Sequence, residues 1–357
     1  MPTTEITTRE QLHDYLHAAM QLEHATIPPY LTAMYSIQPG TNSDAFHVLR
    51  VTVVEEMLHL TLAANILNAV GGTPDLRVPG FVPLYPAFLP DGETDFQVSC
   101  QRFSRECMDT FLKIERPQRA PNEESRLIDR GDVGRCRLGV APTSPQMQFY
   151  SIGEFYQEIL RGLERLQGEL GDGLFVGDHA RQVTKEYFYS GGGAVVPVTD
   201  LESARAAIEL ISEQGEGFGG GIYDSEHEIA HYYRFRQLQL GRYYRAGDRP
   251  DHPTGPPIQV DWDAVYPIKT DVRLADYPAD SEVRLAALEF NKSYADFLGV
   301  LTHAYLGRPG LLLGAVSDMF RLREQMTRLI HNPIPGLDQV NAAPTFEITL
   351  PVTAVAS

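Results

Sequence analysis

The amino-acid sequence predicts an all-α protein, a four-helix bundle with long irregular insertions and two extra C-terminal helices. In several long segments apolar residues recur at three- and four-residue steps, the pattern of helices with one buried face. Segments rich in proline or glycine separate these helical stretches. Two of the helices carry a Glu-x-x-His sequence on the face that should be apolar. Because no internal repeat or clean domain boundary interrupts the chain, we expect residues 1–357 to form a single domain.

The first bundle helix is expected over residues 8–37. Thr7 and Glu10 fit a capping box, in which a hydroxyl and a carboxylate each accept a hydrogen bond from a free backbone N–H at the helix start. Pro28 and Pro29 lie inside this helix, where proline removes a donor and clashes with the preceding turn. We therefore expect a kink or bulge at these two residues.

The other three bundle helices are expected over residues 43–70, 151–170 and 223–244. Ser43 or Asp44 can cap the second helix, and a Gly-Gly pair follows its last turn. The helices over residues 151–170 and 223–244 each follow a long connection.

Two long insertions separate the bundle helices, at residues 73–150 and 173–222. The first is rich in proline and contains one short helix around Met108–Leu112. The second contains a short helix from Leu201 to about Ile211, followed by a glycine-rich turn. After a further proline-rich connection, the two C-terminal helices are expected over residues 281–330.

Composition excludes several classes of function. Lys and Arg number 30 and Asp and Glu number 47, so the formal net charge is −17. Nucleic acids and anionic membrane surfaces would be repelled by such a field. No apolar run approaches the roughly 20 residues that a membrane-spanning helix needs. The three cysteines and the absence of a signal-peptide pattern at the N-terminus predict a cytoplasmic protein with reduced thiols.

Charged residues lie on helix faces that should be buried. In the second helix Glu56 and His59 follow the apolar stripe, and in the fourth helix Glu228 and His231 do the same. Glu23 lies on the core face of the first helix. Its position and that of Glu56 average 39.5, at the expected turn between the two helices, so these two side chains should face each other across the hairpin.

A pair of metal ions explains these buried groups. An unpaired buried carboxylate costs several kcal/mol, so these groups need a compensating positive charge. Carboxylates and imidazoles together suit iron, with manganese as the alternative. In dinuclear helical bundles, two helices contribute one Glu each and two contribute Glu-x-x-His each. The sequence therefore predicts a site for two metal ions.

The fourth carboxylate stays open on helical periodicity alone. Glu154 points away from the apolar stripe of the third helix and fits a capping box with Ser151. Glu158 lies nearer that stripe but off its centre. Glu216 lies among glycines, where the backbone could bring its side chain close to a metal.

A purely structural interpretation of the polar groups is the alternative. Ser225 and Glu228 also fit a capping box, which would explain Glu228 without a metal. That interpretation does not explain His231, nor the matching pair in the second helix.

The combined motifs resemble one known family. The segments LEHATIPPYLTAMYSI, VVEEMLHLTLAANILNAVGG, SIGEFYQEI, EQGEG and HYYRF are similar to those of the ferritin-like family named for iminophenyl-pyruvate dimer synthase of violacein-type pathways. LYPAFLPDG, FSRECMDTFLKIERP and the terminal APTFEITLP match as well, so the resemblance covers most of the chain.

The resemblance implies a ferritin-like helical bundle with a dinuclear metal site. It places the family's GEFY and QGEG motifs on Glu154 and Glu216, and favours Glu154 as the fourth carboxylate, with Glu216 next or as an extra ligand. The expected ligands are then Glu23, Glu56, His59, Glu154, Glu216, Glu228 and His231.

The expected function is a diiron oxidoreductase of specialised metabolism that uses O₂ or peroxide. Its substrate would be a small, aromatic amino-acid-derived molecule, and the outcome oxidative coupling, desaturation, hydroxylation or N-oxygenation. Tyr30 and Tyr232 are the candidate catalytic residues, because a phenol near such a site can donate a proton or an electron. An electron donor and assembly into a homo-oligomer are left open.

Three other functions compete with this one. The first is iron oxidation, iron storage or peroxide removal without an organic substrate. The second is a scaffold whose bundle has lost its metals. The third is a non-covalent haem held by a lone histidine, for which His24, His47 or His227 are available.

Overall fold

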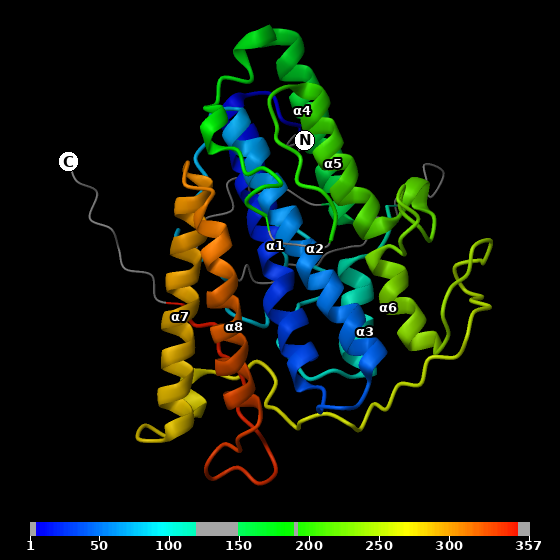
Figure 1. The fold of residues 1–357 in the computed structure, drawn as a ribbon, viewed down its shortest axis with the longest axis vertical. Coiled ribbons are helices and arrows are strands. Elements are labelled where there is room, and N and C mark those ends of the chain that lie inside the picture. The colour runs from blue at the N-terminus through cyan, green and yellow to red at the C-terminus, as the bar shows by residue number, and fades with distance from the viewer. Residues whose placement is uncertain (1–4, 119–148, 189–191, 349–357) are drawn as a thin grey trace.

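The computed structural model describes residues 5–118, 149–188 and 192–348, which contain eight α-helices and no β-strand. The predicted all-α fold is thereby confirmed. At its centre lie α1 (Arg9–Ser36) and α2 (Ser43–Ala69), packed along each other as an antiparallel pair (Figure 1). Residues 119–148 of the first expected insertion lie outside the described residues.

The two expected C-terminal helices are present as α7 (Glu282–Tyr305) and α8 (Leu311–Ile330). They pack on each other and cover one side of the α1–α2 pair (Figure 1). The other side of the pair is covered by the four remaining helices.

Those four helices form two columns, each built from two successive helices. In one column α3 (Arg105–Ile114) is followed by α4 (Ile152–Leu170), and in the other α5 (Leu201–Glu216) is followed by α6 (His231–Leu240). The upper helices α4 and α5 pack together, as do the lower helices α3 and α6 (Figure 1). The bundle therefore has four columns, and two of them are interrupted near mid-height.

The expected helix over residues 223–244 is wrong at both ends, because α6 spans only His231–Leu240. Asp224 accepts hydrogen bonds from the backbone N–H groups of Glu226 and Glu228, and this turn replaces the expected first helical turns. The second insertion contains more helix than expected, since α5 continues to Glu216.

α5 ends at a turn that only glycine fits. Gly217 has a φ of +88°, and a Cβ there would lie 1.8 Å from the carbonyl oxygen of Gly221. Any other residue at position 217 would clash with this turn and strain its backbone.

α1 begins one residue later than its expected cap. Thr8, not Thr7, is the N-cap, and its capping box closes with Gln11 rather than with Glu10. The helix runs without interruption through its two prolines. Pro29 has no N–H to give to the carbonyl of Ala25, and the hydroxyl of Tyr85 donates to that oxygen instead, at 2.8 Å.

α2 is not capped by Ser43 or Asp44. Its N-cap is Asn42, whose left-handed backbone makes no side-chain cap. The Asn42 amide instead exchanges two hydrogen bonds of 2.8 Å with the backbone of Asp261, and thereby fastens the start of α2 to a distant loop.

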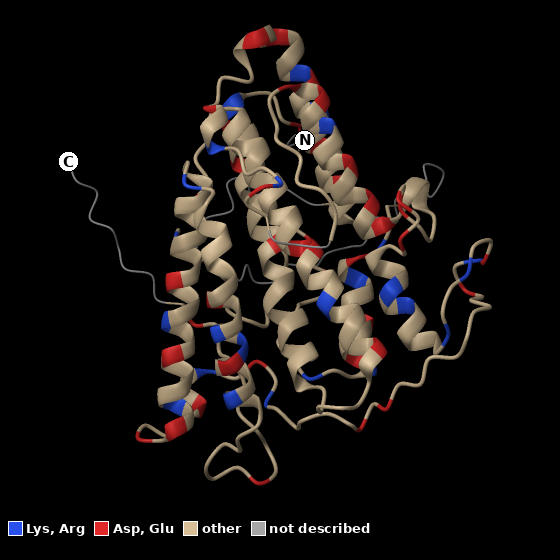
Figure 2. Ribbon diagram, in the orientation of Figure 1, with Lys and Arg blue, Asp and Glu red and all other residues tan. Residues whose placement is uncertain are grey.

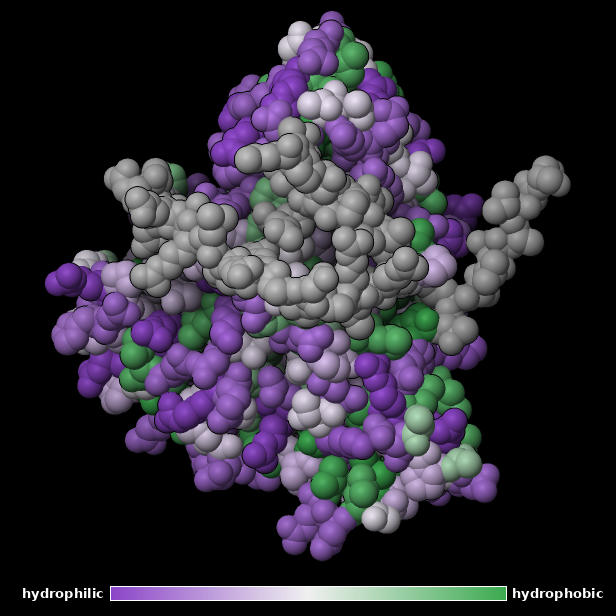
Figure 3. All heavy atoms as spheres, turned by 180° about the vertical axis from the view of Figure 1, so that it is seen from behind, coloured by the Kyte–Doolittle hydropathy of each residue, from purple (hydrophilic) through white to green (hydrophobic). Residues whose placement is uncertain are grey.

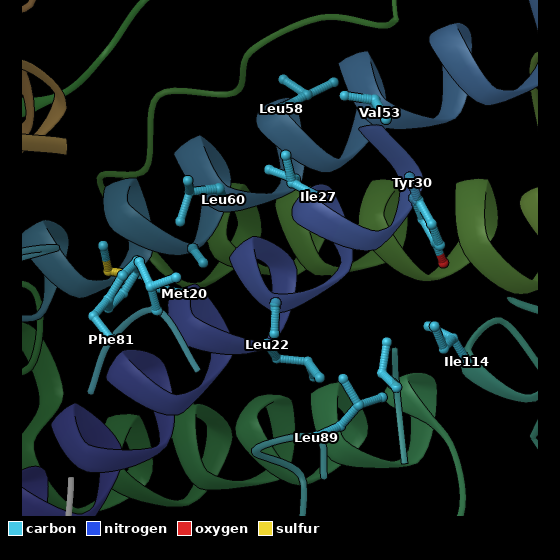
Figure 4. Close-up of a cluster of buried hydrophobic side chains, with 14 of the residues drawn as sticks. Met20, Leu22, Ile27, Tyr30, Val53, Leu58, Leu60, Phe81, Leu89 and Ile114 are labelled. Atoms are coloured by element: carbon cyan, nitrogen blue, oxygen red, sulfur yellow. The ribbon is translucent and has the colours of Figure 1, made fainter. Parts of the chain in front are cut away.

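Buried apolar side chains from all the α-helices and several connections form the main core. Figure 4 shows the part where Ile27 of α1 packs beside Leu58 and Leu60 of α2. Charged residues lie mostly on outer faces, but a red band also crosses α2 near its middle (Figure 2). On the rear face, hydrophobic residues form scattered groups between hydrophilic ones (Figure 3). None of the described helices combines the length and apolarity needed to cross a membrane.

Two glycines of α4 give a test of this packing. At Gly162 a Cβ would lie 2.7 Å from the Cβ of Ile6, whose backbone N–H donates to Glu158 and therefore cannot move away easily. At Gly168 nothing lies within 4 Å. We expect Gly168→Ala to raise the free energy of unfolding by about 1 kcal/mol through helix propensity, and Gly162→Ala to lower it. Urea unfolding measures both, and equal stabilisation by the two variants would contradict this packing.

Candidate metal centre

Two groups of buried ligand atoms lie side by side in the middle of the bundle. One consists of Glu23, Glu56 and His59, and the other of Glu56, Glu115 and His231. Within each group the ligand atoms lie within 4.8 Å of one another. Because Glu56 belongs to both groups, its carboxylate joins two candidate metal positions.

Four columns of the bundle contribute these side chains. α1 contributes Glu23, and α2 contributes Glu56 and His59 on successive turns of its inner face. Glu115 is the C-cap residue of α3, and His231 is the first residue of α6. The second group is therefore assembled at helix ends, where the two outer columns are interrupted.

Both imidazoles present Nδ1 to the carboxylates and Nε2 to a buried oxygen. Nδ1 of His59 lies 3.5 Å from Glu23 Oε2, and its Nε2 lies 2.9 Å from Gln214 Oε1. Nδ1 of His231 lies 3.1 Å from Glu56 Oε1, and its Nε2 lies 2.7 Å from Glu55 Oε2. An oxygen at Nε2 holds the proton on that nitrogen, so the Nδ1 lone pair is available to a metal.

Nδ1 of His231 is buried and makes no hydrogen bond, although two carboxylates lie beside it. A buried nitrogen without a partner is uncommon and calls for an explanation. A metal ion between the imidazole and the carboxylates would satisfy this nitrogen, and the donor set therefore fits such an ion.

A buried phenol holds the outer carboxylate of each group. Tyr156 donates its hydroxyl to Glu23 Oε1 at 2.5 Å, and Tyr30 donates to Glu115 Oε1 at 2.5 Å. Figure 4 shows Tyr30 reaching from α1 toward Ile114, the residue before Glu115. Burial, followed by the nearby carboxylates, raises the pKa of both phenols well above the ordinary value, so both keep their protons.

Glu55 belongs to neither group but contacts the second one through His231. It accepts hydrogen bonds from His231 and from Arg234, three residues further along α6. Burial alone would raise the pKa of Glu55, but these two partners outweigh it and lower the pKa below its usual value. An ionised Glu55 thus fixes the orientation of the His231 ring.

Glu216 lies at the meeting point of three helix ends. Its carboxylate accepts hydrogen bonds from the backbone N–H groups of Gly153, at 2.8 Å, and Gln118, at 3.0 Å. A Cβ at Gly153 would lie 2.4 Å from Glu216 Oε1, so only glycine lets the carboxylate approach the start of α4. This position favours an anion, since unpaired N–H groups point outward at a helix N-terminus.

The carboxylates outnumber the cations that contact them. Five are buried, Glu23, Glu55, Glu56, Glu115 and Glu216. Among the described side chains they contact two imidazoles and one guanidinium. Burial, aided by the charge of Glu115, raises the pKa of Glu56 to about 8, and burial raises that of Glu216 to about 7. Such excess negative charge is what divalent cations relieve.

The imidazoles take up part of this charge. Burial alone would lower the pKa of His59 and of His231, but the negative carboxylates around the two rings outweigh it and raise both values. Without metal the cluster therefore holds extra protons on both kinds of group. Metal binding must displace those protons.

The structure brings together most of the expected residues. Glu23, Glu56, His59 and His231 all contribute to the two groups, and Glu23 and Glu56 face each other as expected. Tyr30 also lies in the cluster, through Glu115. Glu216 lines the same small cavity but belongs to neither group.

Three expected residues lie outside the cluster. Glu154 accepts a hydrogen bond from the backbone of Tyr150 and helps to cap α4, with Ser151 as N-cap. The Glu228 side chain is 59% exposed and pairs with Arg234, because residue 228 precedes the start of α6. Tyr232 is half-buried and packs edge-on against Tyr233.

Sequence reasoning missed Glu115 as a ligand and Glu55 as a support. A signal for Glu115 existed in the short helix of the first insertion. Met108, Phe111 and Leu112 form its buried stripe, and Glu115 continues that stripe at the next position. For Glu55, no such signal exists, since its role depends on Arg234 and His231 arriving from α6.

The cavity among these carboxylates is small, at about 10 Å³. That volume holds roughly one water molecule. It has room for ions or a small oxidant, whereas an aromatic molecule does not fit in this conformation.

Comparison with known proteins agrees with this architecture. The Ferritin-like family model matches residues 16–240, well over half of the chain. A ferritin-like protein from Caulobacter vibrioides has a similar fold, with a TM-score of 0.60 and 22% identity over 90% of this chain and 96% of that one.

An enzyme relative is also found. The chain is 25% identical, over 82% of its length, to dichlorochromopyrrolate synthase of Lentzea aerocolonigenes. The aligned part is only 29% of that enzyme, so the chain spans less than a third of its relative. Given the family match, the chain belongs to the Ferritin-like family.

The raised carboxyl pKa values predict how the stability of the metal-free protein depends on pH. The folded state keeps protons on Glu216 and Glu56 up to pH about 7 and about 8, while ordinary glutamates lose them near 4.5. This stabilisation is fully present below pH 4.5 and is lost as pH rises from 4.5 through about 7 for Glu216 and about 8 for Glu56. We expect the free energy of unfolding, measured with urea and a chelator, to fall over this range. Glu216→Gln should flatten the slope, and an unchanged slope would contradict the assignment.

Proposed function

Starting from membership in the Ferritin-like family, we propose that this protein is a dinuclear metal enzyme, with iron as the metal, that uses O₂ or peroxide to oxidise a small aromatic substrate. The observation that carries the proposal is the sharing of Glu56 between two groups of buried ligands. Each group has one imidazole whose Nδ1 points inward. This is the donor chemistry of dinuclear carboxylate sites.

In this proposal Glu23, Glu56 and His59 hold one ion, and Glu56, Glu115 and His231 hold the other. Glu216 lines the same cavity and is the candidate for an additional ligand. Its carboxylate would then exchange its hydrogen bonds from two backbone N–H groups for a metal ion, at modest cost. The ions supply the redox chemistry that protein side chains lack.

The chain's own residues position the ions and manage protons. Gln214 and Glu55 fix the imidazole rings through Nε2. Tyr156 and Tyr30 each hold a proton at the phenolic oxygen, against Glu23 and Glu115. Both phenols touch ligand carboxylates, so in this proposal Tyr156 takes the role expected of Tyr232.

The substrate class is inferred from the relative. That enzyme is named for making dichlorochromopyrrolate, which supports a biosynthetic role and a small organic substrate for this chain. Because the chain corresponds to less than a third of that enzyme, the substrate and reaction here are proposals in their own right.

A second candidate function has one observation in its favour. The cavity at the carboxylates measures about 10 Å³, which admits an oxidant but no aromatic ring. Iron oxidation or peroxide removal without an organic substrate needs no more room than this. Oxidation of an aromatic substrate requires the helix ends around Glu216 to move apart.

Metal stoichiometry tests the ligand assignment. We expect about two iron ions per chain after anaerobic loading. Glu56→Gln should lose both, because the shared carboxylate holds each of them. Glu115→Gln should lose one, because it belongs to a single group. Metal analysis after gel filtration measures the content of each variant.

Glu228→Gln is the matched control, because this Glu-to-Gln change lies outside the cluster. It should retain both ions and a helical circular-dichroism spectrum like that of the wild type. The assignment is wrong if Glu228→Gln loses metal while Glu115→Gln keeps it.

Oxygen consumption separates the two candidate functions. With the iron-loaded chain, phenylpyruvate plus ammonium or indolepyruvate plus ammonium should increase O₂ uptake well beyond the amount needed to oxidise the bound iron. Tyr156→Phe should reduce this excess by about a hundredfold or more, the usual scale for loss of a positioned proton donor. Uptake that stops at the iron equivalent, with every aromatic acid tried, would favour iron oxidation instead.

A further inference from the structure

A second, larger cavity lies on the opposite side of the α1–α2 pair from the carboxylates. It has a volume of about 230 Å³ and lies between this pair and the α7–α8 pair. An apolar cavity of about 150 Å³ is enough to bind benzene. The cavity is therefore large enough for an aromatic molecule of more than one ring.

Most of its wall is apolar and adaptable. Four methionines from three helices, α1, α2 and α8, line it, together with leucine, phenylalanine and tyrosine side chains. The methionines are Met34, Met57, Met319 and Met326. Side chains that border a void lose dispersion contacts, which an apolar ligand would restore. Methionine also adjusts its shape to different ligands.

One residue that lines this cavity carries a buried polar atom without a partner. His24 lines the cavity and is 2% exposed, and its Nε2 lies 2.9 Å from the hydroxyl of Tyr294. Its Nδ1 is buried and makes no hydrogen bond. Unlike His59, His24 contacts no carboxylate among the described residues, so this nitrogen calls for a hydrogen-bonding group on a ligand.

Two arginines line the same cavity where it opens to solvent. Arg50 of α2 and Arg323 of α8 are both exposed, and in the described part of the chain neither forms a salt bridge. Unpaired guanidinium groups are unusual neighbours for an apolar cavity in a chain with a net charge of −17. They complement a carboxylate at the mouth.

We propose that this cavity binds an aromatic carboxylic acid whose ring carries a hydroxyl or N–H group. The ring would lie among the methionines, the ring hydroxyl or N–H would reach His24, and the carboxylate would face the two arginines. A fatty acid fits less well, because its chain has no group for His24 deep in the cavity. The site is separate from the metal centre and does not depend on the proposed function.

Binding of 6-hydroxy-2-naphthoate, a fluorescent acid of this class, tests the proposal. We expect saturable binding to the full-length protein, of equal affinity with and without bound metal. 2-Naphthoate lacks the hydroxyl, and 6-hydroxy-2-naphthamide lacks the charge, so each should bind about tenfold more weakly.

Variants assign the contacts. His24→Phe should remove the preference for the hydroxyl, and Arg50→Gln with Arg323→Gln should remove the preference for the acid over the amide. Ala315→Phe, which fills the cavity from α8, should weaken binding at least tenfold. Leu313→Phe is its matched control, on the same helix but exposed and outside the cavity, and should bind like the wild type.

Three results would overturn the proposal. One is the absence of saturable binding at millimolar concentrations. Another is equal binding by the Ala315 and Leu313 variants when both are folded by circular dichroism. The third is displacement of the probe by metal, which would place it at the carboxylates instead. If Ala315→Phe fails to fold, the affinities of the three naphthalene probes for the wild type and for His24→Phe still test the proposal.

Discussion

Burial of five carboxylates in the middle of a helical bundle is the constraint on which the rest of this structure depends. Each buried ion costs several kcal/mol, on the order of the whole stability of a domain when summed. The chain meets this cost with paired partners: an imidazole or phenol for Glu23 and Glu115, a guanidinium for Glu55, and backbone N–H groups for Glu216. Protons on Glu56 and on the imidazoles take up part of the remaining charge, and metal ions can replace those protons.

The interrupted columns follow from the same constraint. A continuous helix offers no backbone donors in its middle, whereas a helix start offers several. Ending α5 and beginning α4 at one level lets the N–H of Gly153 reach Glu216. Ending α3 and beginning α6 at that level brings Glu115 and His231 within 3.5 Å of each other. The breaks therefore supply both the ligands and the donors that hold them.

Helical periodicity predicted the longer helices α1, α2, α4, α7 and α8, because apolar residues recur at three- and four-residue steps along each of them. The same reasoning located Glu23, Glu56 and His59, whose positions depend only on those helices. It failed for Glu228, because its position depends on where α6 begins, and the turn at Asp224 decides that. It left Glu115 unrecognised, because a short helix inside a proline-rich insertion gives little reason to expect a core position.

The two faces of the α1–α2 pair explain how a closed polar site and an open apolar cavity coexist. Successive helical residues point about 100° apart, so neighbours in sequence can serve opposite sides. Glu23 reaches the carboxylate cluster while His24 lines the apolar cavity, and Glu56 and Met57 divide in the same way. Because both sites share one rigid helix pair, a change that moves this pair would alter both. The cavity is covered by α7 and α8 together with Tyr187 and Phe188, and none of these contributes a ligand to the two groups. The α7–α8 pair therefore borders the apolar cavity but takes no part in the metal centre.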